Sequence, residues 1–184
     1  YQRQIREAMP SLRPDLGNDL SALRREAIRV LLERAGEDPG LAEPAFEVFF
    51  EARQKVIFYE DAISTLDFLK SRYPMVALSN GNADIQKVGL KDYFVAAFNP
   101  INLGVGKPDP KMFHAGAQAL GVLPEEVLHI GDDPHLDVLA SQRAGMQSVW
   151  VNRDEKQWAH DTHPAPFTVK CLKSLCDAWP VASK

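Results

Sequence analysis

The stretch HIGDDPHLDV, residues 129–138, is the part of the sequence that decides the fold. Its first residues continue an apolar run and its last residues begin a helical spacing, so three aspartates fall at and just after the end of a predicted strand: Asp132, Asp133 and Asp137. Like charges packed this closely repel one another unless something neutralises them. Ligands of open parallel sheets bind at the carboxyl ends of strands. The stretch therefore predicts a polar site at a strand end.

Helical and β-rich segments alternate on both sides of this stretch, from Tyr59 onward. The predicted strands cover residues 75–80, 95–101, 126–133, 147–152 and 167–170. The predicted helices cover residues 61–72, 82–90, 110–121, 135–145 and 172–179. Apolar strands that alternate with helices indicate a parallel sheet with helices on both faces. The predicted fold class is therefore α/β, with a Rossmann-like parallel sheet.

Residues 1–58 carry helical signals and no convincing strand. Apolar positions recur every three or four residues in two segments, residues 19–36 and residues 41–56, as in amphipathic helices. We therefore expect two domains. A small all-helical domain covers residues 1–58, and an α/β domain covers residues 59–184.

Composition and charge argue against several classes of partner. The chain has 184 residues, 45% of them hydrophobic, and a net charge of -4 with lysines and arginines spread along the sequence. This pattern indicates no nucleic acid and no acidic membrane surface as partner. No apolar run reaches the roughly 18 residues of a membrane helix. The two cysteines suit a reducing compartment. We expect a cytoplasmic protein that is a monomer or a homodimer.

Two further predicted strand ends carry polar residues. Ser79 and Asn80 follow one strand, and Gly81 after them lets a backbone come close. Lys107 follows the next strand, between glycines and prolines. Each signal alone is more often structural, as a turn, a surface loop or a helix cap. In this order along a β-α series, however, donors, a lysine and carboxylates would surround a phosphoryl group and a divalent cation.

A divalent cation would also explain the crowded aspartates. Mg²⁺ takes oxygen ligands, and its charge offsets the repulsion between neighbouring carboxylates. The predicted cofactor is therefore Mg²⁺, and its predicted ligands are Asp132 and Asp133.

Three motifs together resemble those of the haloacid dehalogenase (HAD) superfamily of phosphohydrolases. LSNGN (residues 78–82) resembles the second motif, GVGKPDP (residues 104–110) the third, and GDDPHLD (residues 131–137) the fourth. The helical first third resembles the cap of the cap-type-one members. NGNADIQKVGLKDYF (residues 80–94) is similar to a branch that includes flavin mononucleotide and ribitylaminouracil phosphate phosphatases.

This resemblance implies a phosphatase that acts on a small phosphorylated metabolite. It implies that Ser79, Asn80 and Gly81 bind the phosphoryl group together with Lys107. Lys107 would also balance charge on the nucleophile, which makes Ser79 and Lys107 candidate catalytic residues.

The same resemblance assigns roles to the aspartates. Asp132 would bind Mg²⁺ directly, and Asp133 would support it directly or through water. Asp137 would orient the ligands around the metal and is the third candidate catalytic residue. His129, inside a predicted strand, is expected to be structural.

The family's first motif, Asp-Xaa-Asp, is absent from this sequence. No aspartate is followed by another two residues on. Covalent phosphoryl transfer needs a nucleophile in line with the phosphorus, so the chain as written is expected to be inactive. We expect the nucleophile and the first strand of the sheet ahead of Tyr1. Two alternatives stay open: a 2-haloacid dehalogenase-like hydrolase, which needs no metal, and an inert anion-binding remnant.

Overall fold

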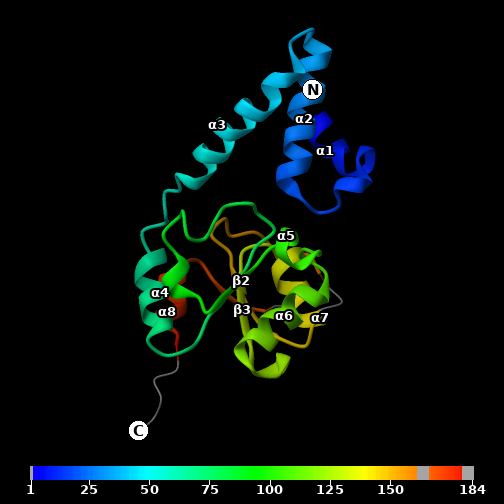
Figure 1. The fold of residues 1–184 in the computed structure, drawn as a ribbon. Helices are drawn as coiled ribbons and strands as arrows, with labels where there is room; N and C mark the ends of the chain where they lie inside the picture. Colours follow the sequence, from blue (N-terminus) through cyan, green and yellow to red (C-terminus); the bar gives the residue numbers. More distant parts are fainter. Residues whose placement is uncertain (1, 161–165, 180–184) are drawn as a thin grey trace. The chain divides into compact units, whose positions relative to one another are not determined.

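The computed structural model describes residues 2–160 and 166–179 (Figure 1). The chain divides into two compact units, which we call the helical unit and the sheet unit. The helical unit comprises Tyr1–Val56, Ser79–Leu90 and Asn99–Gly106. The sheet unit comprises Ile57–Leu78, Lys91–Phe98 and Lys107–Lys184.

The helical unit is built from amphipathic helices. Its helices and short 3-10 turns are α1 (Gln2–Leu12), η1 (Pro14–Leu16), α2 (Leu20–Ala35), η2 (Pro39–Leu41), α3 (Ala42–Gln54) and α5 (Pro100–Leu103). The helix predicted over residues 19–36 is confirmed: Asp19 caps α2 by accepting from two backbone N–H groups, and Gly36 ends it at φ 75°. Apolar side chains from α1 and α2 form its core, and they are Ile5, Met9, Leu23 and Ala27.

The strands of the sheet unit pair in parallel, as predicted. They are β1 (Val76–Leu78), β2 (Ala96–Phe98), β3 (Leu128–Gly131), β4 (Gln147–Val151) and β5 (Phe167–Val169). They form two sheets rather than the single predicted one, since β1 pairs with β2, and β4 lies between β3 and β5. The single-sheet prediction is wrong because no strand in the described ranges joins the two sheets by backbone hydrogen bonds.

Helices and turns connect the strands of the sheet unit. They are α4 (Ala62–Lys70), η3 (Lys91–Tyr93), α6 (Pro110–Leu120), η4 (Pro124–Glu126), the π-helical turn η5 (Pro134–Leu139), α7 (Ala140–Arg143) and α8 (Leu172–Asp177). Two buried clusters make up the core. The first contains Phe113, Ala117, Ala140, Ala144 and Met146, and the second contains Val149, Val151, Val169 and Leu175.

The helix predicted over residues 82–90 is wrong. The segment forms a turn, in which Asp84 Oδ1 accepts the backbone N–H groups of Gln86 (2.8 Å) and Lys87 (3.3 Å). Gly89 then adopts φ 79°, the left-handed region in which a helix ends. Asp84 starts a single turn, in which its backbone carbonyl also accepts the Val88 N–H at 3.0 Å, and the left-handed glycine ends that turn before a helix can extend.

Asp61 joins three parts of the sheet unit. Its carboxylate accepts hydrogen bonds from Arg153 Nη2 at 2.8 and 3.1 Å, after β4. It also accepts the backbone N–H groups of Leu172 (2.7 Å) and Lys173 (3.3 Å), at the start of α8. Asp61 itself precedes α4. One side chain therefore holds the starts of two helices and the loop after a strand.

Replacing Asp61 with alanine is expected to lower the free energy of unfolding by about 2 kcal/mol, because hydrogen bonds to a charged group are lost and Arg153 loses its partner. Urea denaturation measures this change. Asp67→Ala is the matched control: Asp67 is exposed and accepts a hydrogen bond from the Tyr93 hydroxyl. The control is expected to cost less than about 1 kcal/mol. Equal losses in the two variants would contradict the role of Asp61.

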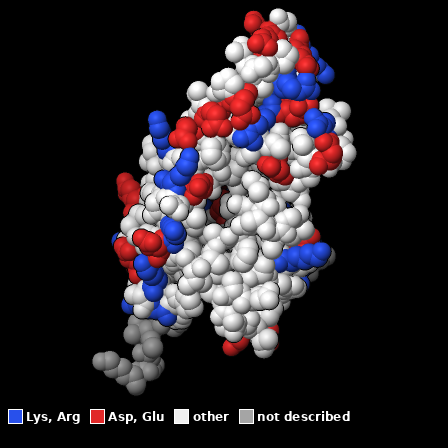
Figure 2. Space-filling model, in the orientation of Figure 1, with Lys and Arg blue, Asp and Glu red and all other residues white. Residues whose placement is uncertain are grey.

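Helix lengths and surface charge are the features that bear on binding to membranes and nucleic acid. Within the part of the chain that the structure describes, every helix is too short or too polar to cross a bilayer. On the face shown in Figure 2, basic and acidic side chains are interspersed, without a continuous basic patch.

Candidate active site

The carboxylate of Asp137 is the centre of a polar cluster beside the carboxyl end of β3. Asp137 lies in η5, and its side chain is 5% exposed. Its Oδ1 accepts a hydrogen bond from Lys107 Nζ at 2.5 Å and lies 3.1 Å from His129 Nε2. Its Oδ2 accepts the backbone N–H of Asp133 at 3.1 Å. Asp137 therefore holds the lysine ammonium and the chain after β3 with the same carboxylate.

Asp137 is ionised in this environment. Burial raises the pKa of its carboxyl, but the hydrogen bond from His129 and the charge of Lys107 outweigh burial and hold the pKa well below its ordinary value. The Lys107 side chain is itself only 13% exposed. Lys107 and Asp137 thus form a partly buried ion pair, which holds the lysine ammonium near the end of β3.

Gly131 explains how Asp137 comes so close to the strand. A Cβ atom at position 131 would lie 2.3 Å from Cγ of Asp137 and 2.4 Å from its Cβ. Neither distance is possible between carbon atoms that are not bonded. A glycine at the end of β3 is therefore what allows the Asp137 side chain to lie against this strand.

Asp133 and Asp132 follow Gly131 and differ in their surroundings. Asp133 caps η5, since its Oδ1 accepts the backbone N–H groups of His135 (2.8 Å) and Leu136 (2.7 Å). Asp132 is exposed, and its backbone carbonyl accepts a hydrogen bond from Trp150 Nε1 at 3.0 Å. Two neighbouring carboxylates thus follow the end of β3, and that of Asp133 is engaged as a helix cap.

The chemistry of Asp132 and Asp133 suits Mg²⁺ better than a metal with many protein ligands. In the described ranges, no three or more His, Cys, Asp or Glu side chains are grouped to hold a metal ion. Mg²⁺ commonly binds through only one or two carboxylates, together with waters and substrate phosphate oxygens. Two adjacent carboxylates therefore fit Mg²⁺ and would not complete a structural zinc site.

Ser79, Asn80 and Gly81 belong to the helical unit and directly follow the last residue of β1. The Ser79 hydroxyl accepts the backbone N–H of Gly81 at 3.0 Å. A Cβ at Gly106 would lie 2.8 Å from Asn80 Oδ1, so the chain at Gly106 passes close to this amide. Within this unit a hydroxyl and an amide are therefore held together on one short turn.

His129 belongs to this polar cluster, a contact that the sequence did not predict. Its Nε2 lies 3.1 Å from Asp137 Oδ1 and its ring packs edge-on against Phe113, which is compatible with the structural role expected for it. The signal was its place in the strand: side chains two residues apart share a face, so His129 faces the same side as Gly131, against which Asp137 lies.

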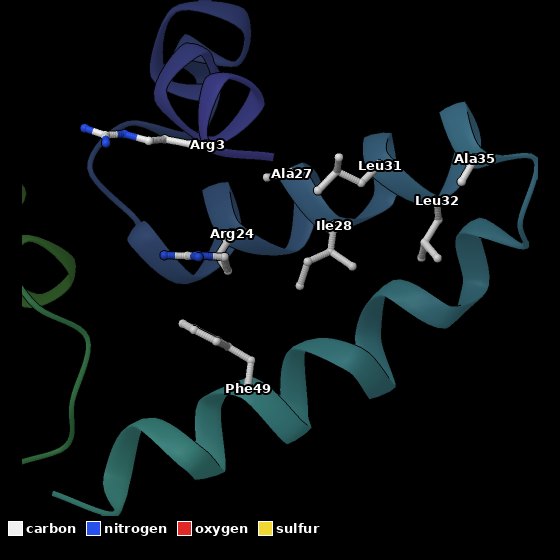
Figure 3. A pocket seen from close by; sticks show the side chains of 8 residues that line it. All are labelled: Arg3, Arg24, Ala27, Ile28, Leu31, Leu32, Ala35 and Phe49. Atoms are coloured by element: carbon white, nitrogen blue, oxygen red, sulfur yellow. The ribbon is translucent and has the colours of Figure 1, made fainter. Parts of the chain in front are cut away.

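A groove of about 530 Å³ lies within the helical unit (Figure 3). It is lined by apolar side chains and two arginines, which are Arg3, Arg24, Ala27, Ile28, Leu31, Leu32, Ala35 and Phe49. The Arg24 guanidinium lies over the Phe49 ring, 4.5 Å from its centre. The lining holds no acid, thiol or histidine, so it offers no group for bond cleavage.

Comparisons with known proteins show which family this chain belongs to. Residues 3–145 match the family model of the haloacid dehalogenase-like hydrolases. A phosphoserine phosphatase from Thermus thermophilus is 35% identical over 71% of this chain and 55% of its own length. The Escherichia coli 5-amino-6-(5-phospho-D-ribitylamino)uracil phosphatase YigB is 31% identical over 81% of this chain and 64% of its own length. The chain therefore spans less than two thirds of these relatives.

A solved structure with high similarity carries a different activity. It is a 2-haloacid dehalogenase from Pseudomonas syringae, which is 34% identical with a TM-score of 0.84 over 96% of this chain and 78% of that one. Both hydrolase chemistries that the sequence left open are thus represented among the similar proteins.

Proposed function

This chain belongs to the haloacid dehalogenase-like hydrolases, and from that membership we propose that it is part of a Mg²⁺-dependent phosphatase that acts on a small phosphomonoester. The observation that carries the proposal is the cluster beside β3: a lysine ammonium held by a buried carboxylate, next to two further carboxylates. Phosphoryl transfer needs positive charge around the phosphoryl oxygens. Lys107 and a cation on the aspartates would supply it.

Each residue of this cluster has a proposed role. Lys107 contacts the phosphoryl group and the nucleophile, and Asp137 orients the ammonium through its short hydrogen bond. His129 is the second contact of Asp137 and limits its rotation. Because Asp137 is ionised and buried, the ammonium is held in one place before substrate arrives, which avoids reorganisation during the reaction.

Asp132 and Asp133 are the proposed Mg²⁺ ligands. When bound, the metal supplies Lewis-acid stabilisation of the phosphoryl oxygens. The exposed Asp132 side chain offers direct coordination, while Asp133 also caps η5. We propose the Ser79 hydroxyl and the Asn80 amide as hydrogen-bond donors to the phosphoryl group, with Gly81 allowing the backbone to come close to it.

The nucleophile is proposed to be an aspartate of an Asp-Xaa-Asp segment ahead of Tyr1 in the whole protein. Two observations support this: the sequence has no such pair, and the similar phosphatases are longer than this chain. The proposed intermediate is an aspartyl phosphate, formed when a carboxylate oxygen attacks phosphorus and the alcohol leaves. Without that segment, the chain alone is expected to release no phosphate.

The relatives suggest which phosphomonoesters to try. One is named for phosphoserine and another for a ribitylaminouracil phosphate. We propose that the substrate is a small phosphorylated metabolite of the same kind. A panel of phosphoserine, ribitylaminouracil phosphate and flavin mononucleotide, compared by kcat/KM, would rank the candidates.

A 2-haloacid dehalogenase is the second candidate, favoured by the TM-score of 0.84. Displacement of a halide from carbon needs no divalent metal, and two adjacent carboxylates would repel an anionic substrate. The discriminating assay uses the whole protein with its Asp-Xaa-Asp segment. Phosphate release from p-nitrophenyl phosphate that depends on Mg²⁺ supports the phosphatase. Chloride release from 2-chloropropionate without metal supports the dehalogenase, and neither product supports the inert remnant.

Asp132→Asn is expected to lower Mg²⁺-dependent phosphate release by the whole protein at least about 100-fold, because the neutral amide binds Mg²⁺ far more weakly than a carboxylate. The measurement is initial rate against Mg²⁺ concentration. Asp15→Asn is the matched control, since Asp15 is exposed and pairs with Arg13. Its rate should stay within about twofold. Undiminished activity in Asp132→Asn would count against the metal assignment.

A further inference from the structure

We propose that Trp150 is a positioning residue that fixes how Asp132 and Asp133 present their carboxylates to Mg²⁺. The inference rests on the proposed function, because it takes these carboxylates as the metal ligands. Trp150 lies in β4 and is in register with Gly131, the last residue of β3. It therefore lies beside the point where the chain leaves the strand and enters the pair of aspartates.

The peptide group between the two aspartates is held at both ends. Its carbonyl oxygen, on Asp132, accepts the Trp150 indole N–H at 3.0 Å. Its N–H, on Asp133, donates to Asp137 Oδ2 at 3.1 Å. A peptide group is planar, so two such bonds fix its orientation and the positions of the two Cα atoms that carry the aspartate side chains. Asp137 supplies one of these anchors, and Trp150 supplies the other.

Trp150 is itself held firmly. It is 2% exposed, and its ring packs edge-on against Trp158 with the ring centres 5.5 Å apart. Trp158 packs in turn against His160, with the centres 4.9 Å apart. A buried indole N–H needs an acceptor, and the Asp132 carbonyl lies just past the end of the β3 ladder. The hydrogen bond therefore satisfies a buried donor and anchors the first residue after the strand.

Small displacements at this peptide matter for Mg²⁺ in particular. Mg²⁺ demands near-ideal octahedral geometry at about 2.0–2.1 Å, so it tolerates misplaced ligands poorly. Groups that orient metal ligands without touching the metal typically account for about 10–100-fold in metal affinity. Loss of the indole donor should thus weaken metal binding without removing a ligand.

The test compares Trp150→Phe with Trp179→Phe in the whole protein. Phenylalanine keeps an aromatic ring at position 150 and removes the N–H. Trp179 is the matched control because its Nε1 donates to the Tyr73 hydroxyl at 3.2 Å, and not to the aspartates. Binding of Mn²⁺, a substitute for Mg²⁺, is measured by electron paramagnetic resonance, which detects the free ion and needs no turnover. Melting curves recorded without metal test whether both variants are folded.

The dissociation constant for Mn²⁺ is expected to rise about 10-fold in Trp150→Phe and to stay within about twofold in Trp179→Phe. Excess Mg²⁺ should then restore most of the kcat of Trp150→Phe. Should Trp150→Phe fail to fold, β-benzothienylalanine at position 150, in which sulfur replaces the N–H at nearly constant shape, decides instead. Wild-type affinity in the folded variant overturns the role of Trp150. A wild-type protein that binds no Mn²⁺ overturns the metal site itself, and this inference with it.

Discussion

Asp137→Asn is expected to lower the free energy of unfolding by about 3 kcal/mol at neutral pH, the lower end of what is lost when one partner of a buried ion pair is removed. Asparagine keeps the shape and one acceptor oxygen but leaves Lys107 and its ammonium in a site that is only 13% exposed, without the opposite charge. Urea denaturation at pH 7 measures the loss. Asp154→Asn, at an exposed carboxylate, should change stability by less than about 0.5 kcal/mol.

The pH dependence of this difference identifies its cause. The pKa of the Asp137 carboxyl in the folded protein lies below its ordinary value, while in the unfolded chain an aspartate titrates near about 3.9. The stabilisation is therefore complete above the unfolded pKa and is lost as the pH falls through the folded one. The stability difference between wild type and Asp137→Asn should begin to shrink below about pH 4 and continue to shrink as the pH falls toward the folded pKa. A difference that stays constant from pH 7 into this acidic range would show that the ion pair is not its source.

Lys107→Met is expected to lower kcat of the whole protein by about 100- to 1,000-fold, the usual effect of removing one group that stabilises transition-state charge. Methionine keeps an unbranched side chain of similar length without the ammonium. The measurement is steady-state phosphate release at saturating Mg²⁺. Lys170→Met is the matched control, because Lys170 is exposed and pairs with Glu155. Its kcat should remain within about twofold.

A double variant separates the catalytic from the structural role of this lysine. Lys107→Met alone leaves the buried carboxylate of Asp137 without its cation, so it should be less stable than wild type. Lys107→Met combined with Asp137→Asn removes both charges and should recover part of that stability, because the two residues are coupled. Activity should not recover. Recovery of activity together with stability would mean that the lysine acts only through folding.

The sequence predicted best what depends on local pattern and strand order. Apolar runs identified β3 and β4, and Asp132 and Asp133 directly follow the end of β3, where parallel strands present ligands. The helical prediction over residues 82–90 failed because Gly89 adopts a left-handed conformation that ends the segment after one turn, which the spacing of apolar residues does not reveal.

Contacts between segments far apart in the chain could not be predicted from the sequence. His129 shares a face of β3 with Gly131, and only the close packing of Asp137 on that glycine makes the histidine part of the cluster. Trp150 is buried in β4, and its indole N–H reaches the Asp132 carbonyl. Such hydrogen bonds depend on the register between two strands, which a single sequence does not encode locally.

The division of the chain into two units determines which segments are needed to express the helical unit alone. The polypeptide leaves the helical unit after Val56 and returns to it twice, for Ser79–Leu90 and Asn99–Gly106. The returning segments bond to the helices, as when Asn82 Nδ2 donates to Ser21 Oγ at 3.2 Å and Gln54 Oε1 accepts the backbone N–H of Asp84 at 2.8 Å. A clone that stops at position 56 would omit these partners. Expression of the helical unit by itself therefore requires a polypeptide in which its three segments are joined, rather than a single truncation.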